Sequence, residues 1–179
     1  MEEENKKPVA AYNESTIKKI RQIVKESLDS STEITWEKSP SQWFGYFEVE
    51  TTKYQIKIEC DAKKVDNLDI WTFKFLYWDG KAWSMNLTNN NTSFIVFGSL
   101  KKGIFEFFDA INPDVFLFVG DAIRDTLYKK FCALLALHKH YGFLDDFKEF
   151  VYILLSKNVS AETIEKIKEI VNSYTKNTE

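Results

Sequence analysis

Hydrophobic and polar residues alternate with a period of two through much of the first half of the chain. Residues 43–49 and 54–60 place an apolar side chain at nearly every second position, which is typical of strands with one buried face. With Thr51–Thr52 as the turn, Val49 would lie opposite Tyr54. The pattern predicts an antiparallel hairpin whose apolar side chains share one face.

A second alternating segment, residues 71–77, predicts another strand. Gly80 follows it and supplies a turn residue that tolerates a left-handed backbone. The next strand would run from Trp83 towards Leu87, with Phe75 opposite Trp83. Together the two hairpins predict a four-stranded antiparallel meander.

Elsewhere apolar residues recur at spacings of three and four, which predicts amphipathic helices. The expected helices are one beginning near Ser15, one over residues 94–112, one over 122–140 with Asp121 as its cap, and one capped by Ser160. Two short apolar runs, residues 115–119 and 148–155, predict buried strands between these helices.

This order of elements predicts an α+β fold. The four-stranded meander would be extended to a mixed sheet and packed with about four helices in a single domain, residues 13–179. Residues 1–12 are polar and charged and predict a mobile N-terminal tail. A chain of 179 residues is long enough to bury one core without disulfides or a structural metal.

The charge balance limits the classes of partner. The 24 Lys and Arg against 27 Asp and Glu leave a net charge of −3, which argues against general nucleic-acid or membrane-surface binding. The sequence has neither a secretory signal nor an apolar run long enough to span a bilayer, so we expect a cytoplasmic protein. Aromatic residues reach 16% of the chain, which favours some aromatic surface beyond the core.

The residues that usually carry metal or nucleophilic chemistry do not fall into a recognisable pattern. Cys60 and Cys132 lie far apart in the sequence, and His138 and His140 would point to different faces of a helix. No Ser or Cys motif accompanies a plausible base. We therefore expect no catalytic residue, no metal and no cofactor.

The turn after the apolar run 115–119 is the strongest candidate for a ligand site. Gly120 gives the turn backbone freedom, and Asp121 precedes a predicted helix. Arg124 and Tyr128 share one face of that helix. A helix N-terminus attracts anions, and a guanidinium can hold a phosphate or carboxylate with two hydrogen bonds. The alternative is a capped helix in which Arg124, Tyr128 and an aspartate pack together without a ligand.

Four short motifs between Leu87 and Tyr128 resemble a layout seen in small uncharacterised proteins of phages and bacteria. The motifs are Leu87-Thr88-Asn89, Pro113-Asp114, Gly120-Asp121, and Arg124 followed by Leu127-Tyr128. The resemblance covers about 42 of 179 residues and departs from the layout at Ile123, where a serine is common. It implies a compact α+β protein and, because that family has no assigned activity, no reaction.

The sequence as a whole favours a non-enzymatic module that binds another protein through an acidic, aromatic-bearing surface. Its Lys- and Asn-rich composition fits a phage or a low-GC bacterium, and a host protein such as a defence enzyme is one expected partner. Phe44, Tyr46 and Trp78 are the candidate partner-binding residues, because they lie on the wetter hairpin faces. The alternative for these three residues is that a terminal helix covers them. The alternative functions are a small-anion or nucleotide site at residues 120–128 and a virion-associated homo-oligomer.

Overall fold

The computed structural model describes residues 18, 31–84, 93–122, 124–156 and 159–176. The predicted tail and nearly all of the predicted first helix lie outside these ranges. So does most of the strand that was expected to run from Trp83 to Leu87. The described part contains three helices and one sheet of eight strands.

The sheet brings together segments from the whole described chain. Its strands lie in the order β1-β2-β3-β4-β6-β8-β7, and β5 also pairs with β4. Only β4 and β6 run parallel; every other pair is antiparallel. The mixed sheet was therefore predicted correctly. The strands are β1 (Thr35–Lys38), β2 (Gln42–Val49), β3 (Thr52–Cys60), β4 (Ile70–Trp78), β5 (Trp83–Ser84), β6 (Val115–Val119), β7 (Gly142–Lys148) and β8 (Val151–Leu155).

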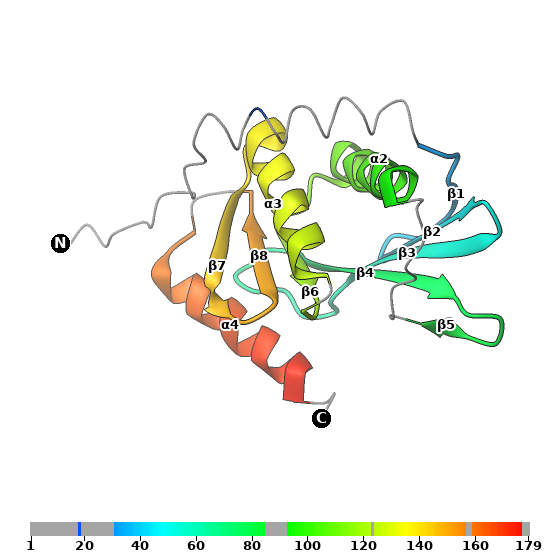
Figure 1. The fold of residues 1–179 in the computed structure, drawn as a ribbon. Helices are drawn as coiled ribbons and strands as arrows, with labels where there is room; N and C mark the ends of the chain where they lie inside the picture. The colour runs from blue at the N-terminus through cyan, green and yellow to red at the C-terminus, as the bar shows by residue number, and fades with distance from the viewer. Residues whose placement is uncertain (1–17, 19–30, 85–92, 123, 157–158, 177–179) are drawn as a thin grey trace.

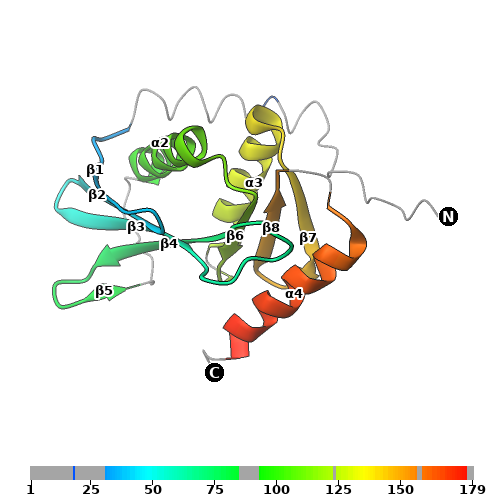
Figure 2. The same cartoon turned by 180° about the vertical axis from the view of Figure 1, so that it is seen from behind.

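The helices cover the two faces of the sheet unequally. Helices α2 (Ser93–Ile111) and α3 (Asp125–Lys139) lie on one face, whereas α4 (Ala161–Lys176) lies on the other (Figures 1 and 2). Apolar residues of α4, including Ile167 and Val171, pack with Val115 and Ile153 of the central strands. Helix α4 thus covers the β6–β8 end of its face, and no described helix covers the same face over β2–β5 (Figure 1).

The first hairpin has the predicted faces but a different register. Val49 pairs with Thr52 and Phe47 with Tyr54, so the turn is Glu50–Thr51 rather than Thr51–Thr52. Glu50 adopts a positive φ of 56°, which closes the shorter loop. The pairing register is therefore shifted by two residues from the predicted one. Because side chains alternate between the two faces of a strand, an even shift keeps the apolar side chains on one face.

The second hairpin differs more from its prediction. Trp83 pairs with Trp78, not with Phe75, and it therefore lies on the opposite face from the one expected. The side chain of Asp79 accepts hydrogen bonds from the amides of Lys81 and Ala82 at 2.8 and 2.9 Å, which shapes a four-residue loop. Gly80 has the predicted left-handed backbone, with a φ of 99°.

Two strands were missing from the prediction. β1 lies at one edge of the sheet, and β7 lies at the other edge, where the sequence indicated only loops. The pairing of β7 with β8 contains a register shift between Leu144 and Lys148. The predicted four-stranded meander is not confirmed: its last strand, β5, is described over two residues only, and the other part of the same edge of β4 pairs with β6.

Aromatic rings fill the core under α2 and α3. Phe73, on β4, is fully buried and has four ring neighbours, with centroids between 5.1 and 6.4 Å away. Those neighbours come from β6 and α3: Phe116, Phe118, Tyr128 and Phe131. The packing ties the candidate turn after β6 to the centre of the sheet.

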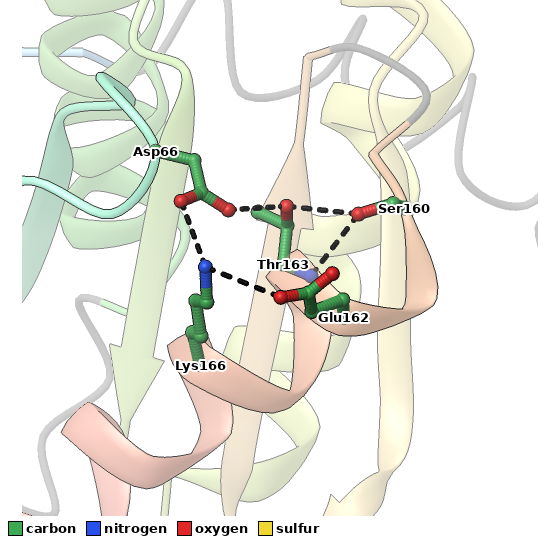
Figure 3. Close-up of polar contacts among 5 residues, drawn as sticks. All are labelled: Asp66, Ser160, Glu162, Thr163 and Lys166. Atoms are coloured by element: carbon green, nitrogen blue, oxygen red, sulfur yellow. Dashed lines mark hydrogen bonds and ion pairs between the residues drawn. The ribbon is translucent and has the colours of Figure 1, made fainter.

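Polar contacts fix the start of α4 to the loop between β3 and β4 (Figure 3). Asp66 accepts a hydrogen bond from the Thr163 hydroxyl at 2.6 Å and another from Lys166 Nζ at 3.0 Å. Ser160 caps the helix, because its Oγ accepts the amide of Thr163 at 3.2 Å. The Thr163 and Lys166 hydrogen bonds lower the pKa of the Asp66 carboxyl.

We predict that this contact weakens in acid. A carboxyl whose folded-state pKa is depressed stabilises the fold above its unfolded pKa of about 3.9, and that stabilisation is lost as the pH falls through the folded value. Asp66→Asn should therefore lower the melting temperature at pH 6, and the difference from the wild type should disappear towards pH 2. Thermal denaturation across this range measures it.

The matched control is Glu169→Gln, which removes an exposed carboxylate from the same helix. This variant should have the same melting temperature as the wild type at every pH. An Asp66→Asn deficit that persisted unchanged at pH 2 would contradict an ionic origin.

Candidate functional site

The predicted ligand site is the turn between β6 and α3. Gly120 follows the last residue of β6, and its amide donates to the carbonyl of Phe150 at 3.0 Å. Asp121 Oδ1 accepts the amide of Arg124 at 2.9 Å, so the helix begins at Asp125 instead of residue 122. The turn is thereby fixed at both ends, by the connection between β7 and β8 and by the start of α3.

Gly120 is required here by a close approach, not by an unusual backbone. Its φ lies outside the left-handed region. A methyl group on its Cα would come within 2.8 Å of two ring carbons of Tyr128, Cδ2 and Cε2. Tyr128 is fully buried, so its ring has little room to move away.

Arg124 is buried beside this tyrosine, with only 1% of its side chain exposed. Its Nη1 donates to Asp121 Oδ2 at 2.7 Å, and the Asp121 side chain is 46% exposed. The Arg124 Nε and Nη2 atoms have no hydrogen-bond partner among the described residues, and neither does the Tyr128 hydroxyl. Desolvation raises the pKa of Tyr128 well above its ordinary range, so the hydroxyl keeps its proton.

The structure therefore brings all four predicted ligand-site residues together: Gly120, Asp121, Arg124 and Tyr128. The Arg124–Asp121 ion pair and the close approach of Gly120 to Tyr128 hold them in one cluster. The cluster is unusual because buried donors are normally satisfied, and an unmatched one costs about 1–3 kcal/mol.

Other polar groups in the described residues offer no comparable chemistry. No group of three or more His, Cys, Asp or Glu residues in these ranges could hold a metal ion. In the Asp66 cluster every polar side chain drawn in Figure 3 has a partner within the cluster. Those contacts position α4 and do not point to a ligand.

The predicted partner-binding residues lie on the part of the sheet that no described helix covers. We call this surface, formed by outward side chains of β2–β5, the open face. Trp78 is 39% exposed, and Phe44 and Tyr46 are half-buried, so none of the three is buried in the core. Of the predicted alternatives, cover by the C-terminal helix is not observed, because α4 packs at the β6–β8 end, and the predicted N-terminal helix lies almost wholly outside the described residues. The open face comprises Gln42, Phe44, Tyr46, Glu48, Lys53, Gln55, Lys57, Glu59, Thr72, Lys74, Leu76, Trp78 and Trp83.

The side chains of the open face contact one another across four strands. Trp83 lies 5.5 Å from Trp78 and 6.0 Å from Tyr46, measured between ring centroids. Gln55 donates to the Tyr46 hydroxyl at 3.2 Å and is only 8% exposed. The aromatic side chains therefore form a connected surface instead of scattered exposed rings.

Lysines lie along one side of this aromatic surface. Lys57 and Lys74 are directly opposite each other on β3 and β4. The Lys57 ammonium lies 5.6 Å from the centre of the Phe44 ring and 3.5 Å from the Glu59 carboxylate. Glu59 thus compensates Lys57, whereas Lys74 has no ion-pair partner among the described residues, so the Lys74 position of the open face favours an anionic group from outside.

Sequence reasoning missed Trp83 as a surface residue because it placed Trp83 opposite Phe75, three residues away on β4 from its observed partner Trp78. The available signal was Asp79, whose carboxylate can cap a loop of four residues as readily as Gly80 can close one of three. The pairing of Lys57 with Lys74 was also missed. It followed only once the register of β3 and β4 was known.

Comparisons with known proteins supply no function for the chain. No protein-family model matches it, and neither a curated protein nor a solved structure is significantly similar to it. The resemblance of residues 87–128 to small phage and bacterial proteins therefore stays a prediction. Within the described ranges, no helix is both long and apolar enough to cross a bilayer.

We predict that Gly120→Ala destabilises the protein by about 1–3 kcal/mol, because the new methyl overpacks the Tyr128 ring. Urea denaturation measures the loss. The same substitution in a Tyr128→Leu background should cost clearly less, since the ring carbons that the methyl meets are gone. An equal cost in both backgrounds would show that the ring is not the obstacle.

Proposed function

We propose that this protein is a non-enzymatic module that binds another protein through the open face. The observation that carries the proposal is the contact between two exposed tryptophans, Trp78 and Trp83, on a sheet surface without a described helix. Connected, solvent-exposed aromatic side chains on a sheet are a common basis of protein interfaces, and Trp and Tyr dominate their binding energy.

The surroundings of the tryptophans support a protein partner of defined chemistry. The aromatic side chains would receive apolar groups, while Lys74, opposite the Glu59-paired Lys57, would receive a carboxylate beside them. Hydrogen-bonded Gln55 holds Tyr46 in place, so the surface is partly organised before binding. The fitting partner therefore presents an apolar anchor with an acidic residue next to it.

The expected phage origin and a host protein such as a defence enzyme remain part of this proposal. A virion-associated oligomer is the competing reading, in which a second copy of the chain covers the open face. Light scattering of the purified protein separates them: a monomer in solution supports a different protein as the partner.

We predict that removing either tryptophan strongly weakens partner binding while the fold survives. A tagged full-length chain incubated with bacterial lysate should capture one stoichiometric protein. With that protein purified, Trp78→Ala and Trp83→Ala should each weaken binding by about 30-fold or more, because truncation of an anchor costs about 2 kcal/mol or more. Calorimetry or surface-based binding assays measure the change.

The matched control is Ile111→Ala. Ile111 is 37% exposed, close to the 36% of Trp83, but it belongs to α2 on the other side of the sheet. This variant should bind like the wild type. Lys74→Glu should weaken binding and remove part of its salt sensitivity. Capture that is equal for all four variants, or no capture by the wild type, would refute the proposal.

A further inference from the structure

Arginine is rare in this chain, which makes the buried one informative. Of the 24 basic residues, 22 are lysines and the two arginines are Arg21 and Arg124. Arg124 is among the largest fully buried side chains, whereas most lysines of the described residues lie at the surface. A lysine would supply the same charge, so the position uses a property that lysine lacks: a planar fork of fixed donors.

Only one side of the Arg124 guanidinium has a hydrogen-bond partner. Asp121 binds Nη1, while Nε and Nη2 have no partner among the described residues. Nε–H and one N–H of Nη2 lie on the same edge of the guanidinium plane and point in parallel. That edge matches the spacing of two oxygens on a carboxylate or phosphate.

Tyr128 supplies a third unmatched donor, its hydroxyl. Its amide donates to the Arg124 carbonyl at 2.9 Å, so the two side chains project from the same helix face one turn apart. Burial keeps the hydroxyl protonated, so it can donate. Nε, Nη2 and the Tyr128 hydroxyl thus all need acceptors, and the first turn of α3 adds its positive potential.

We propose that the turn between β6 and α3 binds a singly charged carboxylate, which accepts hydrogen bonds from Arg124 Nε and Nη2 and from the Tyr128 hydroxyl. A carboxylate fits better than a phosphate dianion, because Asp121 and Asp125 already place negative charge at this helix end. Lys129 forms an ion pair with Asp125 at 2.9 Å. The ion-pair partner of Asp121 is Arg124 itself.

The ligand must be small at its charged end. The unmatched atoms of Arg124 and Tyr128 are themselves buried, whereas Asp121 is half-buried and Ala122 is exposed, so binding requires these two turn residues to move aside. The site is independent of the proposed function, because α3 lies on the opposite side of the sheet from the open face (Figures 1 and 2). Each can fail without the other.

Nuclear magnetic resonance tests the proposal with little ambiguity. The spectrum of arginine Nε–H groups should contain two signals, and Arg21→Lys identifies the one that belongs to Arg124. Addition of sodium acetate should shift the Arg124 signal saturably and leave the Arg21 signal in place. Inorganic phosphate should shift it less, and sodium chloride at equal ionic strength should not shift it. An Arg124 signal that acetate does not move would overturn the proposal.

Two variants separate a binding role from a purely structural one. Tyr128→Phe deletes a buried hydroxyl without a partner, so the protein without acetate should melt at the same or a higher temperature. Its stabilisation by acetate should nevertheless become smaller. Arg124→Lys keeps the charge but loses the fork, and acetate should no longer stabilise it. Equal acetate stabilisation in the wild type and both variants would place acetate elsewhere and refute the site.

Discussion

The parallel pairing of β4 with β6 is the constraint on which the rest of the structure depends. Four residue pairs, from Ile70–Val115 to Phe73–Phe118, join the antiparallel strands of the N-terminal half to the β6–β8 unit. A parallel pair needs a long connection, and here α2 supplies it by crossing one face of the sheet. The side chains of this pairing are buried on both faces, against α2 and α3 on one side and α4 on the other.

The same pairing divides β4 into two parts with different surroundings. Its first half lies against β6 and is buried, whereas its last residues pair with the short β5 and carry Trp78 to the surface. The open face therefore begins where β6 ends. The packing of Phe73 against Tyr128, with ring centroids 5.9 Å apart, links this central strand to the turn that holds Arg124.

Sequence patterns predicted the faces of the strands better than their registers. A shift of two residues in the first hairpin kept every apolar side chain in the core, whereas an odd shift in the second moved Trp83 to the other face. Loop geometry decided both cases, through the positive φ of Glu50 and the side chain of Asp79. The sequence placed Gly120, Asp121, Arg124 and Tyr128 together. The burial of the Arg124 guanidinium, with one edge lacking hydrogen-bond partners, depends on packing from distant segments and was not predicted.

The edges of the sheet have a consequence for association. β7, at one end, is interrupted by an irregular register between Leu144 and Lys148, and β1, at the other end, is only four residues long and carries Lys38. An irregular or short, charged edge strand presents a poor template for an added strand. Strand addition at these edges, the usual first step of uncontrolled aggregation of sheets, is therefore discouraged even though the chain is rich in aromatic residues.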